Sequence, residues 1–379
     1  MTYHEIFLSQ PQTTVQFSSF LPKDGIGEWH AMLHVVPQGD SFESQLARLY
    51  KATEELLALP EFSTAHCVAK RYFLSDNTNQ APLLREEENV ALSIIGQAPL
   101  NGSKVALWIY LQENKDITKE GAFLCTRHNG YRHLWHSDQI CPSGNSATQT
   151  QNILEEYQRE LAEQGLTMEK HCIRTWFFVR DVDTQYQGMV KARRENFAEQ
   201  NMTGDTHYLA STGIGGNPAN TSALLQMGSY AIDGLEEGQQ RYLYALSHLN
   251  RTIEYGVTFE RGTLVEYGDR KELFISGTAS IDNQGNVMYV GDIHKQTLRM
   301  WENVEALLKE GEAGFEDVAQ MIVYLRDIAD YQVVKEMFDK RFPHTPTMFC
   351  LAPVCRPSWL IEMECIATKC HSNSRFRSF

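Results

Sequence analysis

Alternating apolar and polar positions in "WLIEMECIA" (359–367) predict a strand that carries two acids close to the end of the chain. Side chains point to opposite faces in turn along a strand, so Glu362 and Glu364 share one face. One face would hold Leu360, Glu362, Glu364 and Ile366, and the other Trp359, Ile361, Met363, Cys365 and Ala367. An otherwise apolar strand with two carboxylates on one face needs an explanation.

Helical periodicity appears at three places along the chain. In "QTLRMWENVEALL" (296–308), apolar residues recur at the spacing of one helix face. The segments "QLARLYKATEELL" (45–57) and "QTQNILEEYQRELAEQ" (149–164) repeat this pattern. Each is followed by an apolar strand that ends in aspartate: "YFLSD" (72–76), "FFVRD" (177–181) and "VYLRD" (323–327). Three copies in one order indicate an internal repeat.

The repeat predicts three related units, with boundaries at 1–122, 123–250 and 251–379. Each unit would contain two early strands, a helix, a strand, a second helix and a last strand. Such a unit is an α+β layer whose helices cover one face of the sheet. We expect the helices on the Trp359 face of the last strand, so that the glutamate face meets a neighbouring unit.

The repeat also shows which unit carries the acids. The three aligned last strands give two columns: Trp108, Gln226 and Glu362; and Tyr110, Gly228 and Glu364. A requirement of the fold would be expected in every unit, whereas carboxylates stand only in the third. The pair therefore looks like an addition to the scaffold.

Composition narrows the classes of function. The formal net charge of -14 argues against nucleic-acid binding, which needs clustered Lys and Arg. No apolar run approaches the ~20 residues of a membrane span, and the N-terminus lacks the pattern of a secretory signal. The 8 cysteines form no CxxC pair, which favours free thiols in the cytoplasm. The 13 histidines form no HExxH motif, so we expect neither a metal nor another cofactor.

The two acids suggest proton-transfer chemistry. A carboxyl group half buried between units resists ionisation, and a second carboxylate nearby adds repulsion, so the pKa of one of them rises. A carboxyl group that stays protonated near neutral pH is a general acid, for which Glu362 is the candidate. Glu364 would set the pKa of Glu362 or hold a water molecule. The alternative for either glutamate is a structural ion pair with an arginine.

A second informative segment is "STGIGG" (211–216). Its glycines allow close approach of the backbone, and successive N–H groups can form a concavity for an anion, unless the segment is an ordinary turn. It is not a P-loop, because no lysine follows at the required spacing.

The third unit resembles the Rid family (YjgF-like proteins, also known as endoribonuclease L-PSP or translation initiation inhibitor). The resemblance lies in "LFISGTASID", "GDIHKQTLRMWENVEALL", "DVAQMIVYLRDIADYQVVKEMFDKRF" and "LIEMECIA". Rid proteins are small homotrimers with clefts between subunits. The resemblance therefore implies a pseudo-trimer within one chain, either a monomer or a weak homo-oligomer.

The whole chain resembles a narrower group, the chorismatases, through "TGIGG" (212–216), "RTWFFVRD" (174–181), "ARRENF" (192–197) and Cys355-Arg356 before the acidic strand. These enzymes hydrolyse chorismate and release pyruvate. The resemblance implies that Glu362 is the proton donor and that the partner is a small carboxylate. The candidate substrate-binding residues are Arg356, Arg174, Arg193, Thr212, Gly213, Gly215, Ser276, Gly277 and Cys355. Arginine suits carboxylates because its guanidinium binds them with two hydrogen bonds.

Three hypotheses for function follow. The first is a hydrolase that cleaves the enolpyruvyl ether of chorismate or a related enol ether. The second is a Rid-type deaminase of enamines or imines, and the third is a non-catalytic module that binds a small carboxylate. In the Rid pattern an arginine should stand near Met348, and its absence argues against the second.

Overall fold

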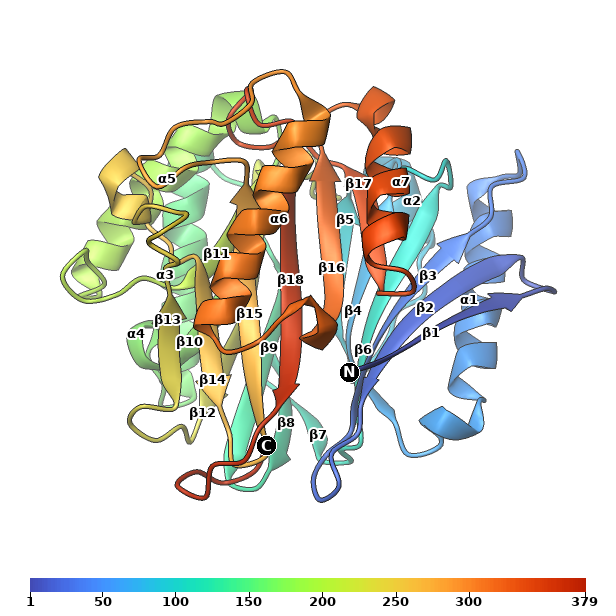
Figure 1. Ribbon diagram of the computed structural model, residues 1–379, viewed down its shortest axis with the longest axis horizontal. Coiled ribbons are helices and arrows are strands. Elements are labelled where there is room, and N and C mark those ends of the chain that lie inside the picture. Colours follow the sequence, from blue (N-terminus) through green and yellow to red (C-terminus); the bar gives the residue numbers. More distant parts are fainter.

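The chain folds into three mixed sheets of six strands each, with one topology. The structure, a computed structural model, describes residues 1–379 apart from the side chain of Tyr255. Numbered within each sheet, the strands lie in the order 1-2-3-6-4-5. The prediction of an α+β pseudo-trimer is therefore confirmed. Figure 1 shows the helices on the outside of the molecule and the sheets facing its centre.

The first sheet is paired with one long helix and one short one. Its strands are β1 (Thr2–Leu8), β2 (Thr13–Phe20), β3 (Glu28–Val35), β4 (His66–Leu74), β5 (Ala91–Gly96) and β6 (Val105–Gln112). Its helices are α1 (Phe42–Leu57) and α2 (Asn77–Gln80).

The second sheet carries the longest helical layer. Its strands are β7 (Ile117–Glu120), β8 (Phe123–His128), β9 (Tyr131–Gln139), β10 (Cys172–Val179), β11 (Ala210–Gly215) and β12 (Leu225–Asp233). Its helices are α3 (Ser146–Glu163), α4 (Met168–His171) and α5 (Val182–Glu199).

The third sheet ends in the acidic strand. Its strands are β13 (Gln240–Leu243), β14 (Gly262–Glu266), β15 (Arg270–Ala279), β16 (Val318–Leu325), β17 (Thr347–Leu351) and β18 (Ile361–Cys370). Its helices are α6 (Ile293–Glu310) and α7 (Tyr331–Arg341).

The predicted content of each unit was incomplete. Every unit has a third early strand, and a further strand follows the position of the second helix: β5, β11 and β17. In the first unit this second helix is reduced to the four residues of α2. The acidic strand begins at Ile361 rather than at Trp359.

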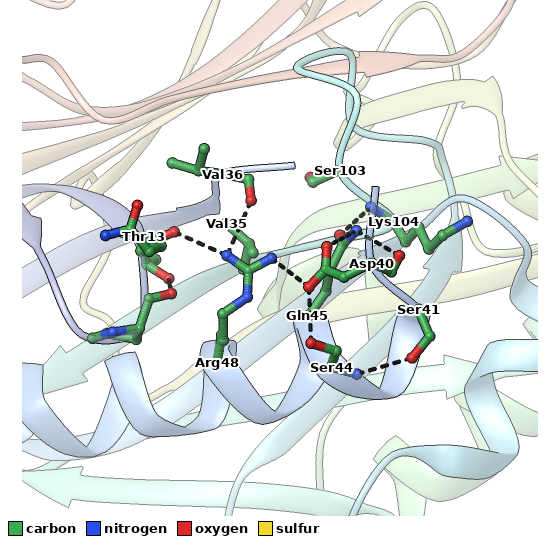
Figure 2. Close-up of polar contacts among 12 residues, drawn as sticks. Thr13, Val35, Val36, Asp40, Ser41, Ser44, Gln45, Arg48, Ser103 and Lys104 are labelled. Atoms are coloured by element: carbon green, nitrogen blue, oxygen red, sulfur yellow. Dashed lines mark hydrogen bonds and ion pairs between the residues drawn. The ribbon is translucent and has the colours of Figure 1, made fainter. Parts of the chain in front are cut away.

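One buried glutamine recurs in the first turn of α1, α3 and α6. Gln45, Gln149 and Gln296 each accept a hydrogen bond from the backbone N–H group of a residue that precedes the last strand of their unit. In all three helices the N-cap side chain lies four residues earlier and accepts from the backbone. Figure 2 shows this arrangement around Gln45, which lies between Asp40 and the Lys104 backbone. The repeat therefore preserves the contact that fastens each helix to its sheet.

The three units close on one another through the strands β5, β11 and β17. Gly96 and Asn217 exchange two backbone hydrogen bonds between the first and middle units. The Gly215 N–H group donates to the Pro353 carbonyl of the third unit, and Leu100 donates to the Phe349 carbonyl across the remaining seam. Each of these sheet edges is thereby covered by a neighbouring unit.

Apolar packing also continues across the seams. One buried cluster includes Trp108 of the first unit, Trp176 of the middle unit and Met363 of the third. Among the described residues, no helix is long and apolar enough to cross a membrane.

We predict that Gln149→Ala destabilises the fold by about 1–3 kcal/mol, because the partly buried Leu224 N–H group loses its acceptor. Gln151→Ala, on the same helix, removes only a contact with Glu155 on the outer side and should stay within about 0.5 kcal/mol of wild type. Urea unfolding measures both variants. Equal losses for the two would contradict the structural role of the repeated glutamine.

Candidate active site

Glu362 lies on the wall of a small cavity between the middle and third units. The cavity encloses about 40 Å³, which is room for a few water molecules. The middle unit contributes Tyr186, Arg193, Ser211 and Gly213, and the third unit contributes Val257, Phe259, Arg261, Gly277, Ala279, Ile281, Cys355, Arg356, Trp359 and Glu362. The glutamate face of β18 thus meets a neighbouring unit, as its pattern predicted.

Gly277 makes room for the Glu362 carboxyl group. A Cβ atom at position 277 would lie 2.1 Å from Glu362 Oε1 and 2.9 Å from its Cδ atom. The Gly277 N–H group donates to Thr212 Oγ1 at 2.9 Å, which ties this part of β15 to β11 of the middle unit. Any larger residue at position 277 would have to displace the carboxyl group.

Burial raises the pKa of Glu362 to about 8. Loss of hydration is the largest cause, and the negative charge of Glu364 acts in the same direction. The positive charges of Arg261 and Arg174 oppose the rise without cancelling it. Glu362 is therefore mainly protonated at neutral pH and can donate a proton into the cavity.

Glu364 is held in a different way. Arg174 Nη2 donates to its Oε2 atom at 2.8 Å, and Trp176 Nε1 donates to its Oε1 atom at 2.9 Å. Arg71 Nη1 of the first unit lies 3.7 Å from the same Oε1 atom. Glu364 does not line the cavity. Its geometry is that of a buried ion pair whose charge is felt by Glu362.

Three guanidinium groups line the cavity. Arg193 projects from α5 and contacts Ser211 Oγ at 3.3 Å. Arg261 donates to the carbonyl and side-chain oxygens of Asn250, and Arg356 lies over the Trp359 ring. A wall with three such groups beside one protonated carboxyl group suits an anionic ligand with more than one carboxylate.

The structure separates the predicted site residues into two groups. Those that line the cavity are Glu362, Arg356, Arg193, Gly213, Gly277 and Cys355. Those that support it from outside are Glu364, Arg174, Thr212, Gly215 and Ser276.

Each supporting residue is engaged elsewhere. Arg174 donates to the Ile275 carbonyl and to Thr212 Oγ1 as well as to Glu364, so it does not offer the cavity the carboxylate-binding group predicted for it. Ser276 Oγ donates to the Glu260 carbonyl and accepts from Ser211 N.

Gly215 packs against Pro353 of the third unit. A Cβ atom on Gly215 would lie 2.8 Å from the Pro353 carbonyl oxygen, so this glycine serves the seam.

Sequence reasoning missed Arg261, Tyr186 and Ser211 as lining residues. Ser211 stands inside the quoted "STGIGG" segment, so that signal was present. Arg261 and Tyr186 lie outside every quoted site motif, and only the folded arrangement brings them beside Glu362.

Met348, where the Rid pattern would place an arginine, does not lie at the seam that contains Glu362. Met348 lines a larger cavity of about 400 Å³ between the third and first units, with His34 and Thr14 on the opposite wall. The middle unit supplies Thr212 at the corresponding place, since Thr212 pairs with Trp176 as Met348 pairs with Ile322. The missing arginine at position 348 therefore says nothing about the chemistry beside Glu362.

The strand register also corrects the first unit's place in the comparison of last strands. Arg71 pairs with Trp108 on β6, Trp176 with Gly228 on β12, and Ile322 with Glu364 on β18. Trp108 thus occupies the position of Glu364. The next pairs toward the start of each last strand are Phe73 with Ala106, Phe178 with Gln226 and Tyr324 with Glu362, so Ala106 takes the position of Glu362. Neither change introduces an acid, and the third unit alone carries carboxylates in these columns.

Comparisons with known proteins agree with this architecture. The family model Endoribonuclease L-PSP matches residues 265–369. A RutC family protein of Pyrococcus abyssi is 35% identical over 99 residues, which are 26% of this chain and 78% of that protein. The 3-aminoacrylate deaminase RutC of Acinetobacter baylyi is 29% identical over 97 residues, 25% of this chain and 77% of that protein.

A chorismatase crystal structure is similar over the greater part of the fold. It superposes with a TM-score of 0.65, covers 79% of this chain and 92% of the chorismatase chain, and is 17% identical in sequence. The chain belongs to the RutC family within the Rid/YjgF superfamily, and it has a chorismatase-like fold.

We predict that Glu362→Gln removes a pH-dependent loss of stability. In the folded protein Glu362 keeps its proton up to about pH 8, whereas in the unfolded chain it releases the proton near pH 4.3. The stabilisation is complete below about pH 4.3 and is lost as pH rises to about 8, by about 1.4 kcal/mol per pH unit.

The difference in unfolding free energy between Glu362→Gln and wild type should therefore shift in favour of the variant from pH 5 to pH 8. Urea unfolding at several pH values measures it. Glu163→Gln, on the exposed side of α3, is the control and should give a flat difference. A flat difference for Glu362→Gln would contradict the high pKa of Glu362.

We predict that Gly277→Ala costs about 1–3 kcal/mol, because its methyl group would overlap the Glu362 carboxyl group. Gly228→Ala is the matched strand control, since the nearest atoms to its Cβ would be 3.7 and 3.8 Å away. Thermal and urea unfolding compare the two variants. A Gly277→Ala protein as stable as the control would show that the carboxyl group is free to move.

Proposed function

We propose that the protein is a chorismatase-like hydrolase that cleaves the enolpyruvyl ether of chorismate or a related enol ether, with Glu362 as the general acid. The observation that carries the proposal is a protonated, buried carboxyl group in a cavity lined by Arg193, Arg261 and Arg356. The chorismatase-like fold supports the same choice.

The chemistry begins with proton transfer to carbon. Glu362 donates its proton to the terminal methylene carbon of the enol ether, which produces an oxocarbenium centre at the ether carbon. Water adds to that centre, and the resulting hemiketal breaks its bond to the ring oxygen. The products are pyruvate and a dihydroxycyclohexadiene carboxylate, and Glu362 recovers its proton from the water that was added.

The cationic wall has two tasks in this reaction. Arg193, Arg261 and Arg356 bind the two substrate carboxylates, and their positive charge compensates the carboxylate charge beside the ionised acid after proton transfer. Chorismate does not fit into about 40 Å³, so the cavity has to widen when the substrate binds. We expect movement in the irregular loop 352–360, which carries Cys355, Arg356 and Trp359.

The proposal extends to the setting of the reaction. The units predicted as 1–122, 123–250 and 251–379 would act as one body, except that strand pairing puts β7 (Ile117–Glu120) in the middle unit and β13 (Gln240–Leu243) in the third. The acid lies in the third unit, and part of the cationic wall lies in the middle unit. A monomer is then sufficient for activity. We place it in the cytoplasm, where its eight cysteines, all free thiols, stay reduced.

A deaminase of the Rid type is the second candidate, and the sequence similarity of the third unit to 3-aminoacrylate deaminase RutC of Acinetobacter baylyi favours it. A carboxylate-binding protein without catalysis is the third. The three differ in their products: pyruvate from chorismate, ammonia from an enamine, or binding without turnover.

We predict that the purified protein releases pyruvate from chorismate and that Glu362→Gln lowers the rate at least 100-fold, because the amide cannot protonate carbon. Activity should fall above about pH 8, where Glu362 loses its proton. A coupled lactate dehydrogenase assay measures pyruvate.

The arginine wall has a matched control on the same helix. Arg193→Met should raise KM for chorismate at least tenfold, whereas Arg194→Met, whose side chain is exposed, should leave KM unchanged. Absence of pyruvate would refute the hydrolase. Ammonia release from an amino-acid-derived enamine that depends on Glu362 would establish the deaminase, and calorimetric binding of chorismate without turnover would establish the binding protein.

A further inference from the structure

The guanidinium group of Arg71 lies buried where the three units meet. Arg71 comes from β4 of the first unit, and 5% of its side chain is exposed. Its Cζ atom lies 5.8 Å from the Trp108 ring, 5.2 Å from the Trp176 ring and 5.0 Å from the Phe178 ring. A charge among aromatic rings is expensive unless a counter-charge is present.

That counter-charge comes from the third unit. Among the described residues, Glu364 is the carboxylate within ion-pair distance of Arg71, with 3.7 Å between Nη1 and Oε1. Glu364 also binds Arg174 of the middle unit. One carboxylate is thus contacted by a cation from each of the other two units.

None of these three charges is required by the repeat. The position of Arg71 is taken by Trp176 in the middle unit and by Ile322 in the third, as strand pairing shows. Glu364 corresponds in the same way to Trp108 and Gly228. The position of Arg174, two residues before Trp176, is taken by Gln320 and Ala69. Each unit therefore contributes one charged side chain that the other two lack, and the three meet at the centre.

We propose that Arg71 is a positioning residue for Glu362: it holds the Glu364 carboxylate from the first unit and so fixes the charge and the strand face beside the acid. This inference rests on the role proposed for Glu362. The first unit contributes no residue to the lining of the cavity, and Arg71 gives it a part in the site.

Several charged or titratable groups surround this pair. Glu362 faces Arg174, Arg193, Arg261, Arg356, Tyr186 and Cys355. Glu364 faces Arg71, Arg174, Tyr324, Cys350 and Cys365, and Arg71 also acts on Asp138 of β9. Arg174 is still available to Glu364 when Arg71 is replaced, so Glu364 keeps one cationic partner.

The direction of the effect follows from electrostatics. Glu362 and Glu364 interact, so their protons leave in two macroscopic steps that belong to the pair. Removal of a nearby positive charge makes both steps harder, whichever carboxyl group releases the proton. Arg71→Met should therefore raise the pKa of the second step, assigned to Glu362, by about 0.5 to 1 unit. Arg71→Lys keeps a positive charge and should restore most of the wild-type value.

The test is a titration without substrate. The full-length protein is labelled with ¹³C at glutamate carboxyl groups, and the Glu362 signal is assigned by its loss in Glu362→Gln. Arg48→Met is the matched control, since Arg48 on α1 is another partly buried arginine of the first unit and pairs with Asp40, which precedes that helix (Figure 2). Arg48→Met should leave the Glu362 titration unchanged, because Asp40 rather than Glu364 is its partner.

The outcomes decide the inference independently of catalysis. A rise in Arg71→Met, reversed in Arg71→Lys and absent in Arg48→Met, supports it. An unchanged titration in Arg71→Met, or an equal rise in Arg48→Met, overturns it. If Arg71→Met does not fold, Arg71→Gln replaces it, and failure of both to fold assigns Arg71 a purely structural role and also overturns the inference.

The kinetic readout separates this inference from the proposed function. If chorismate is a substrate, Arg71→Met should shift the alkaline decline of kcat to higher pH. KM should stay within about twofold of wild type, because Arg71 does not line the cavity. A shifted titration without any release of pyruvate would leave the positioning role intact and refute the hydrolase.

Discussion

The arrangement of the three units depends on one buried carboxylate. Glu364 receives hydrogen bonds from Arg174 and Trp176 of the middle unit and an ion pair from Arg71 of the first. Its side chain is 2% exposed, so the charge has no alternative partner in water. Because an unpaired buried charge costs several kcal/mol, each unit is held in a relative position that keeps this contact. The cavity beside Glu362 is lined by the middle and third units, so its shape depends on how these two units are positioned.

The repeat explains what surrounds the centre. The same glutamine fastens α1, α3 and α6, and the same strand order appears in every sheet. Backbone hydrogen bonds then cover the edges of β5, β11 and β17 in cyclic order. The three units share this scaffold, and they differ in the side chains at a few positions that face the seams. Gln226 stands where Glu362 stands in the third unit, and its side chain donates to the Ile94 carbonyl of the first unit across its own seam.

Patterns within one unit were predictable from the sequence, and relations between units were not. Helical periodicity found α1, α3 and α6, and alternation found the glutamate face of β18. The order of repeated segments predicted three related units, and the resemblance to the Rid family implied that they form a pseudo-trimer. The register of β6 was misjudged because the loop before it differs in length from the loop before β18, and sequence matching carried the error from the loop into the strand.

The candidate site was predictable to the same limit. Glu362, Gly277 and Arg356 follow from the third unit itself, whereas Arg261 and Tyr186 belong to no local pattern that points to the cavity. Met348 was assigned to the wrong seam, since sequence does not reveal which neighbour a strand edge will meet. Tyr186 was missed and Met348 misplaced because adjacency between units carries no signal in the pattern of a single unit, and Arg261 was missed because it directly precedes β14 of the third unit, far along the chain from Glu362.

The two acids of β18 share one strand face but lie in different surroundings. Glu364 accepts hydrogen bonds from Arg174 and Trp176 and lies within ion-pair distance of Arg71, so each of its oxygens has a partner. Glu362 lies two residues away and lines the cavity, where the missing side chain of Gly277 leaves space for its carboxyl group. Loss of hydration is the largest cause of the raised pKa of Glu362, and the negative charge of Glu364 acts in the same direction. The raised pKa of Glu362 therefore depends first on its burial at the seam and second on the neighbouring carboxylate, so the two glutamates of β18 are not equivalent although they share one face.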